Sequence, residues 1–257
     1  MTRRDWTRDE LVLAMSLYCQ LPFGRLHKGT PEIVALAGAI GRTSSSVAMK
    51  LSNLASLDPA HQERGVKGLS GASATDRKIW EEFHANWDSL VIESERLRSE
   101  ARLDSGSNEW KEEDESMEAF QGETEAERST KVRLAQRFFR RAVFASFESR
   151  CCVTGIRQAE LLIASHIVPW CQSKEHRANP RNGLCLSRLH DGAFDQGLIS
   201  VDSEYRLIVS KDLAEQFDNS VIKGSFQSFE GKPISMPSRF RPDAKLLQIH
   251  RETIFRG

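Results

Sequence analysis

The sequence predicts an α+β protein with an all-α N-terminal domain, an acidic linker and a mixed C-terminal domain. Three observations favour this arrangement. Apolar residues recur at helical spacing through residues 1–95. Residues 96–128 are crowded with charge and poor in aliphatic side chains, which is typical of a linker. Residues 129–257 begin with a basic amphipathic stretch and continue as short strands, loops and small helices.

The composition of the 257-residue chain is that of an ordinary globular protein, with 39% hydrophobic and 28% charged residues. Its 36 basic and 36 acidic residues cancel, so any attraction for nucleic acid has to come from local charge. No N-terminal segment resembles a signal peptide, and no run of about 18 apolar residues could span a membrane. The 5 irregularly spaced cysteines are typical of free thiols, and we expect a cytoplasmic protein.

Helices in the first region are expected where apolar residues share one face. Leu11 and Met15 follow a capping Thr7, and the segment "PEIVALAGAIG" predicts another helix that ends at Gly41. The segment "TSSSVAMKLSNLASLDP" starts again with a capping hydroxyl. One long helix is then expected over residues 74–95, with an apolar stripe along it.

The segment around Gly41 predicts a helix-turn-helix. Ala37 before the turn is small enough for the two helices to approach, and Val47 after it can fill the angle between them. The second helix then offers polar side chains suited to a DNA groove, namely Ser46, Lys50 and Asn53. The match is partial, because Lys50 lies where an apolar residue is often found. A helical hairpin that does not contact DNA is the alternative.

The acidic stretch within residues 96–128 reads "EWKEEDESMEAFQGETEAER". It cannot bury enough apolar surface to offset the entropy lost on ordering, so a solvated linker is expected. Mimicry of DNA on a basic surface is the less favoured alternative. Beyond the linker, "KVRLAQRFFRRAVFASFESR" predicts a basic amphipathic helix, and "GLISVDSEYRLIVS" predicts two strands joined by a turn at Asp202 and Ser203.

The segment "SHIVPWCQSKEHRANPRNGLCLSRLH" places His166, Asn182 and His190 in one short polar stretch. A neutral imidazole can deprotonate water near pH 7. A divalent ion can stabilise the charge at a phosphate, and a second imidazole or a carboxylate can hold that ion. An amide can orient these groups. The stretch therefore contains a base, an orienting group and a metal ligand, which are the groups that hydrolysis of a phosphodiester bond needs.

His166 is followed by Pro169, then by a loop, by Asn182 with Gly183, and by His190 on an expected helix. This pattern resembles the ββα-metal finger of the HNH endonuclease family. The similarity extends from "RFFRRAVFASFESRCCVTGI" before the motif to "NGLCLSRLHDGAFDQGLISVD" across it. The resemblance implies that His166 is the general base and that His190 is a metal ligand. It implies that Asn182 either orients the base or helps to bind the metal.

The chain departs from the family pattern at Ser165, where many relatives have an Asp or His metal ligand. Asp195 is the candidate replacement, and Asp191 is the second choice. On an ideal helix Asp195 lies about 140° around the axis from His190, so the pair would need a distorted or ending helix. Asp195 could instead cap Gly197 or bind an arginine.

Many relatives also carry a structural zinc ion on two pairs of cysteines, and these pairs are missing here. Cys152 is followed by "VTG", and the second knuckle reads "LSRLH". No structural zinc is expected, which resembles the zinc-less subgroup found in restriction-type endonucleases. A zinc site that borrows histidines is the alternative. The cysteines expected to be small buried hydrophobes are Cys151, Cys152, Cys171 and Cys185.

These features predict an endonuclease that cuts DNA with a divalent cation, Mg²⁺ or Mn²⁺. Arg177 and Arg181 flank the motif and could bind the DNA backbone, although exposed arginines also simply aid solubility. A nuclease joined to a DNA reader resembles restriction enzymes, including those that require modified bases. Double-strand cleavage would need a homodimer or two events. The alternative is a DNA-binding regulator with an inactive HNH fold, for which Ser165 leaves room.

Overall fold

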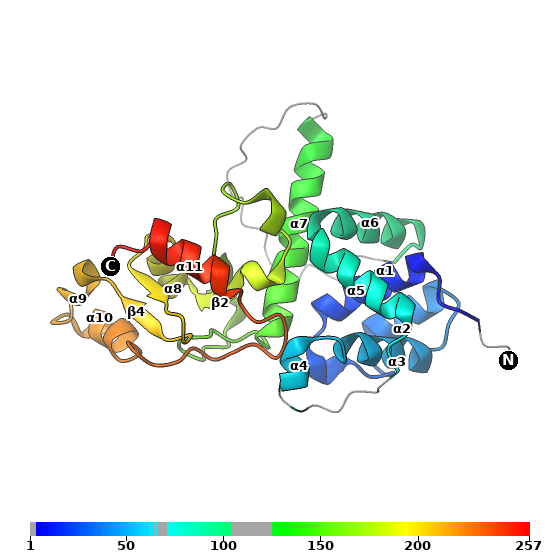
Figure 1. Ribbon diagram of the computed structural model, residues 1–257, viewed down its shortest axis with the longest axis horizontal. Coiled ribbons are helices and arrows are strands. Elements are labelled where there is room, and N and C mark those ends of the chain that lie inside the picture. Colours follow the sequence, from blue (N-terminus) through cyan, green and yellow to red (C-terminus); the bar gives the residue numbers. More distant parts are fainter. Residues whose placement is uncertain (1–3, 64, 66–70, 104–124) are drawn as a thin grey trace.

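Helix α7, Glu125–Ser146, stands between two groups of elements, as Figure 1 shows. Helices from the N-terminal part of the chain lie on one side of it, and the strands and helices that follow it in sequence lie on the other. The computed structural model describes residues 4–63, 65, 71–103 and 125–257. Among these residues, no helix is both long enough and apolar enough to cross a membrane.

Side-chain caps mark where several of the N-terminal helices begin. The Thr7 hydroxyl accepts the N–H of Glu10, and the Glu10 carboxylate accepts the N–H of Thr7, which completes a capping box. Ser73 and Asp76 form the same pair before a later helix. The helices are α1 Arg8–Gln20, α2 Pro31–Ala39, α3 Ser44–Ala55, α4 Pro59–Glu63, α5 Ala74–Ala85 and α6 Trp87–Glu100.

The prediction of one helix over residues 74–95 is wrong, because the chain breaks at Asn86 into α5 and α6. Asn86 has φ −154°, outside the helical region, and its side chain accepts the N–H of Ser89 to cap α6. Helix α6 then continues to Glu100, into the predicted linker. Most of that linker, residues 104–124, lies outside the described residues.

The predicted turn between α2 and α3 is confirmed. Gly41 has φ 65°, which favours glycine, and the two helices pack against each other across it. Ala37 and Val47 are buried between them, as their sizes indicated. The arrangement therefore has the local form of a helix-turn-helix, while its contact with DNA stays a prediction.

The C-terminal part contains a ββα unit. Strands β1 and β2 pair antiparallel, with Leu162 opposite Ser187 and His166 opposite Gly183. Helix α8 begins at once, because the Ser187 hydroxyl accepts the N–H of His190. The elements are β1 Leu162–His166, β2 Gly183–Ser187, α8 Arg188–Asp195, β3 Ile199–Val201, β4 Leu207–Val209, α9 Lys211–Ala214, α10 Ser220–Ile222, a π-helical turn Lys223–Gln227 and α11 Ala244–Thr253.

Strands β3 and β4 confirm the predicted strand, turn and strand. Ile199 pairs with Val209, and the Asp202 carboxylate accepts the N–H groups of Glu204 and Arg206 in the turn, each at 2.8 Å. Asp residues favour turns through such local bonds. Helix α11 packs against β3.

Two faces of α7 enter two apolar clusters. Ala135, Phe138 and Ala142 belong to the cluster formed with the N-terminal helices, which we call the N-terminal cluster. Phe139 and Val143 belong to the cluster formed with the ββα unit, which we call the C-terminal cluster. Neighbouring residues on a helix point about 100° apart, so adjacent phenylalanines can serve different clusters.

A segment from the C-terminal part also enters the N-terminal cluster. Phe240 is buried there, with its ring centroid 5.7 Å from that of Trp87 in an edge-to-face contact. The neighbouring Arg239 is fully buried and donates from Nη1 to the Tyr18 carbonyl. The described residues of the two predicted domains thus share one apolar cluster, and the division into domains stays a prediction.

Gly183 lets β2 lie directly against α7. A Cβ atom at this position would meet a methyl group of Val143 and would lie 2.9 Å from Cζ of Phe139. Both neighbours are buried in the C-terminal cluster and have little room to move. A side chain at Gly183 would therefore force β2 and α7 apart.

We expect Gly183→Ala to lower the free energy of unfolding by roughly 1–3 kcal/mol, the usual cost of overpacking a core. Urea denaturation followed by circular dichroism would measure it. Gly38→Ala is the control, because Gly38 lies in α2 with open space around its Cα. That substitution should be neutral or stabilising by up to about 1 kcal/mol. Equal stability of Gly183→Ala and the parent would contradict the close approach.

Candidate active site

The ββα unit positions all three residues of the predicted motif. His166 is the last residue of β1, Asn182 immediately precedes β2, and His190 lies in the first turns of α8. Because His166 pairs with Gly183, Asn182 lies beside the end of β1. Helix α8 packs against both strands. The fold therefore places the three residues of the motif in one small structural unit.

Asn182 holds the loop between the two strands. Its side chain is 1% exposed, and its Oδ1 accepts the N–H of Val168 at 2.9 Å. Its Nδ2 donates to the carbonyls of Val168 at 3.0 Å and His176 at 3.3 Å. All three partners are backbone groups, so the amide as placed orients the loop. The resemblance implied that Asn182 either orients the base or binds the metal, and this geometry fits the first of these roles.

His166 is held by a ring and by a backbone carbonyl. Its imidazole stacks on Phe139 with centroids 3.7 Å apart and planes 8° apart. Its Nε2 lies 3.1 Å from the carbonyl oxygen of Arg177. A carbonyl can only accept, so Nε2 carries the hydrogen, and in the neutral ring Nδ1 carries the lone pair. Burial lowers the pKa of His166 to about 4, which keeps the ring neutral at pH 7.

His190 differs from His166 because both of its ring nitrogens are engaged. Nδ1 lies 2.8 Å from the Ser187 hydroxyl, and Nε2 lies 2.9 Å from the carbonyl oxygen of Ser225. The side chain is 1% exposed and packs against Phe226. Burial also lowers the pKa of His190. For His190 to bind a metal ion through Nε2, the Ser225 carbonyl would have to move away.

The predicted metal ligands do not form a cation site as they lie here. Among the described residues, no three side chains of His, Cys, Asp or Glu gather into a group that could hold a metal ion. Asp195 is exposed at the end of α8, and Asp191 is partly exposed. Ser165, which stands in place of the metal ligand that the resemblance implies, is buried, and its hydroxyl makes no hydrogen bond to the described residues.

The cysteines lie mostly where the sequence suggested. Cys151, Cys152 and Cys185 are buried, and Cys151 Sγ accepts the N–H of Ser187 at 3.3 Å. Burial raises the pKa of the Cys152 and Cys185 thiols, which keeps them protonated. The prediction that Cys171 is buried is wrong, because this residue is exposed on the loop that follows β1. Loop residues lie at the surface, where their backbone groups can reach water.

Lys50 is placed differently from the DNA-contact prediction. Its ammonium is buried and pairs with Asp76 at 2.6 Å, so it joins α3 to α5 and does not face solvent. Ser46 and Asn53 are partly exposed on α3. Near the site, Arg177 donates from Nε to the Trp170 carbonyl at 3.1 Å, and Arg181 pairs with Asp243 at 3.0 Å. The two arginines therefore already have protein partners, and binding DNA would have to compete with these contacts.

Two residues near His166 were missed by the motif. Phe139 supports the imidazole ring from α7, and the apolar pair in "RFFRR" was the available signal for it. Asp88 reaches the loop from α6, where its Oδ1 accepts the N–H of Ala178 at 3.0 Å. No sequence signal joins Asp88 to the motif, because the two are far apart in the chain.

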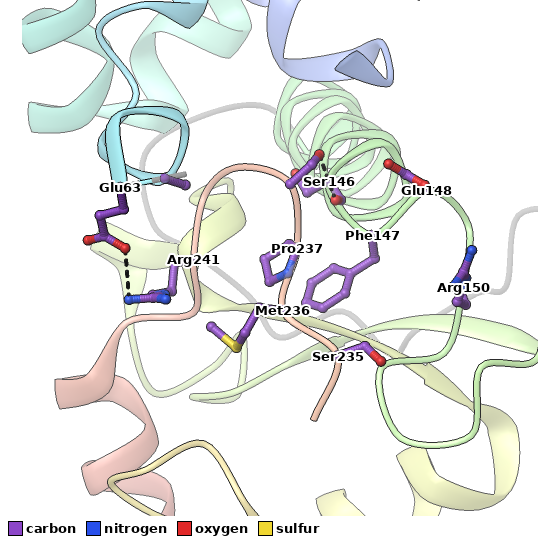
Figure 2. A pocket seen from close by; sticks show the side chains of 11 residues that line it. Glu63, Ser146, Phe147, Glu148, Arg150, Ser235, Met236, Pro237 and Arg241 are labelled. Atoms are coloured by element: carbon purple, nitrogen blue, oxygen red, sulfur yellow. Dashed lines mark hydrogen bonds and ion pairs between the residues drawn. The ribbon is translucent and has the colours of Figure 1, made fainter. Parts of the chain in front are cut away.

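A hollow on another part of the molecule contains none of the predicted site residues. Figure 2 shows it beside the end of α7, where Phe147 and Pro237 line it and Arg241 pairs with Glu63 at 3.2 Å. Two glutamates and two arginines, namely Glu63, Glu148, Arg150 and Arg241, line it, so its charge favours no one class of ligand. The ββα unit remains the candidate site.

Comparison with protein families matches residues 151–202 to the HNH endonuclease model. This segment contains β1, the loop held by Asn182, β2, α8 and β3. No curated protein matches the chain. The family match supports the HNH family and a nuclease, a hydrolase whose substrate is DNA. It falls on the same unit that positions His166, Asn182 and His190.

We expect the His166 imidazole to titrate near pH 4 and not near 6.5, the value of an unperturbed histidine. The sign follows from burial, which disfavours the charged ring, so His166 stays neutral as the pH falls through 6.5 and gains its proton only near 4. NMR of the imidazole carbon resonances would measure the midpoint, with His166→Gln to assign the signal. A midpoint near 6.5 in the folded protein would contradict the burial of the ring.

Proposed function

We propose that this protein is a divalent-metal-dependent DNA endonuclease of the restriction type, with His166 as the general base. One observation carries the proposal. Within a unit that matches the HNH endonuclease family, a backbone carbonyl fixes Nε2–H of His166, and burial lowers the pKa of the ring so that it is neutral at pH 7. Its lone pair is therefore on Nδ1, ready to accept a proton from water.

The reaction follows from this geometry. A water oxygen attacks phosphorus while one proton of the water moves to Nδ1 of His166. The bond from phosphorus to the leaving oxygen breaks, and that oxygen takes a proton from solvent to leave as an alcohol. The ring then carries a positive charge, which the Arg177 carbonyl stabilises through Nε2–H. Asn182 keeps that part of the loop in place through its backbone contacts. General-base catalysis of this kind contributes roughly 10²- to 10⁴-fold.

The divalent cation, Mg²⁺ or Mn²⁺, is proposed from the family resemblance. Such an ion would neutralise charge at the phosphate when bound. The described side chains around His190 do not fit it as they lie, because both ring nitrogens already have partners. Cation dependence is therefore a separate question, which cleavage with and without added Mg²⁺ or Mn²⁺ after chelation would answer. No structural zinc is proposed.

Target recognition is proposed for α2 and α3, which have the form of a helix-turn-helix. Ser46 and Asn53 on α3 are the remaining candidates for contact with DNA, since Lys50 is engaged with Asp76. A reader joined to a nuclease is the arrangement expected of a cytoplasmic restriction enzyme. One site cuts one strand, so double-strand cleavage would require a homodimer or two events. Digestion of methylated and unmethylated phage DNA would test for dependence on base modification.

A second function is favoured by the surroundings of His190. A DNA-binding regulator with an inactive HNH fold would not need a metal ligand, and here the imidazole is buried with both nitrogens bonded inside the protein. Ser165, a poor ligand, stands where the family resemblance leads us to expect a carboxylate or an imidazole in many members. Cleavage assays separate the two functions, because only the nuclease cuts DNA.

Replacing His166 with alanine should lower the rate of plasmid nicking by roughly 10²-fold or more, because the proton acceptor is lost. DNA binding should persist, since the fold does not depend on this ring alone. His27→Ala is the control, because His27 is an exposed histidine outside the ββα unit. Nicking of supercoiled plasmid by the two variants and the parent would measure the effect. A His166→Ala protein that cuts at the parental rate would end the assignment.

His190→Ala separates a metal ligand from a structural residue. The contacts of His190 predict a lower free energy of unfolding, by roughly 1–3 kcal/mol, because Ser187 and Ser225 lose a buried partner. The family role predicts instead a loss of activity that returns at high Mn²⁺. Thermal unfolding and nicking over a range of Mn²⁺ would distinguish them. We expect the first result, and parental stability with recovery by Mn²⁺ would show that His190 is a ligand.

A further inference from the structure

Asp88 and His166 hold opposite ends of one peptide group. The Oδ1 atom of Asp88 accepts the N–H of Ala178 at 3.0 Å. The Nε2 atom of His166 donates to the carbonyl of Arg177 at 3.1 Å. The carbonyl of Arg177 and the N–H of Ala178 belong to the same planar unit. A carboxylate from α6 is thus connected to the imidazole through a single peptide.

We infer that Asp88 is a positioning residue for His166 and acts through the peptide between Arg177 and Ala178. The inference rests on the proposed function for its effect on the rate, but the geometry concerns the imidazole itself. It also gives the N-terminal helices a part in the active site, beyond any recognition of DNA.

The physical reason is polarisation of the peptide. Hydrogen bonds to a charged acceptor are stronger than those between neutral groups, so the Asp88 carboxylate draws the N–H of Ala178 toward it. Bonds in a chain strengthen one another, by roughly 10–30% each in condensed phase, so the Arg177 carbonyl becomes a better acceptor. That carbonyl then holds Nε2–H more firmly and favours the ring that has gained a proton on Nδ1. A carboxylate that binds a histidine directly has the same two effects.

Packing shows that the peptide is held from the N-terminal side. Ala178 is fully buried in the N-terminal cluster, and Trp170 packs against the same cluster. Helix α6 contacts the short helical turn Lys174–His176 that precedes this peptide. Asp88 is itself partly buried, and burial raises its pKa, while its bond to Ala178 and the charge of Arg177 oppose that shift. The loop that carries the Arg177 carbonyl therefore depends on α6.

A simpler role for Asp88 has to be separated from this one. It lies in the first turn of α6, where a negative charge stabilises a helix through its dipole by about 0.3–1 kcal/mol. A carboxylate placed at Ser89, which is exposed in the same turn, could take over that role. It could not be expected to take over the bond to Ala178, because neighbouring helix residues point about 100° apart.

The test compares Asp88→Ala, Asp88→Asn and Asp88→Ala combined with Ser89→Asp, all in the full chain. Asp88→Asn keeps an oxygen that can accept the N–H of Ala178 but removes the charge. Glu93→Gln is the matched control, because Glu93 lies on the same helix and pairs with Arg8. Two measurements are made on each. Nitrogen-15 NMR of the His166 ring reports which nitrogen carries the hydrogen, and plasmid nicking gives the rate and the apparent affinity for DNA.

We expect the parent and Glu93→Gln to hold the hydrogen on Nε2. Asp88→Ala should give a mixture of the two ring forms and a nicking rate about tenfold lower, with unchanged DNA affinity, because the base is present but poorly held. Adding Ser89→Asp to Asp88→Ala should restore neither the single ring form nor the nicking rate. Asp88→Asn should keep the hydrogen on Nε2 and lose a smaller factor in rate.

Parental ring form and parental rate in Asp88→Ala would overturn the inference, as would recovery of both by Ser89→Asp. If Asp88→Ala does not fold, Asp88→Asn decides, since a parental rate in that variant would also overturn it. If the parent does not cut DNA, the proposed function fails and the NMR comparison still decides the role of Asp88. If His166→Ala abolishes cutting while Asp88→Ala matches the parent in both measurements, only the inference fails.

Discussion

Helix α7 is buried on two faces, and the candidate site depends on this constraint. Phe138 enters the N-terminal cluster and Phe139 enters the C-terminal cluster. The ring of Phe139 also stacks on the imidazole of His166. Only a glycine at position 183 lets β2 approach α7 closely enough for that stacking. Burial of apolar surface is the main force in folding, so a helix needed by both clusters fixes their relative position. The same packing that stabilises the protein therefore sets the plane of the imidazole.

Polar contacts then fix the loop between β1 and β2, which lies next to the His166 ring. Buried backbone groups need partners, and in this loop side chains supply them. Asn182 satisfies groups of Val168 and His176, and Asp88 satisfies the N–H of Ala178. The carbonyl of Arg177 is satisfied by His166 itself. Each bond meets a requirement of the fold and also places an atom near the proposed base, so stability and orientation have one origin here.

The two histidines of the motif show how hydrogen bonds separate chemical roles. His166 has one nitrogen bonded to a carbonyl, and its neutral ring offers the other as a proton acceptor. His190 has both nitrogens bonded, to Ser187 and to Ser225, and its ring packs against Phe226. In the sequence, residue type and spacing mark both histidines as site residues in the same way. Only the contacts show that one ring is poised for proton transfer while the other, as it lies, supports α8.

The local elements could be predicted from the sequence, because hydrophobic periodicity, capping residues and turn residues act over a few positions. The strand, turn and strand around Asp202, the turn at Gly41 and the order of the motif all follow from such patterns. Asn86 was the local exception, since its capping role interrupts a helix whose apolar stripe continues. The partners of side chains, by contrast, depend on how the elements pack together. Lys50 turned inward because Asp76 on another helix could pair with it, and Asp88 met Ala178 because both apolar clusters share α7. Such partners depend on long-range packing, and the spacing of residues along the chain does not identify them.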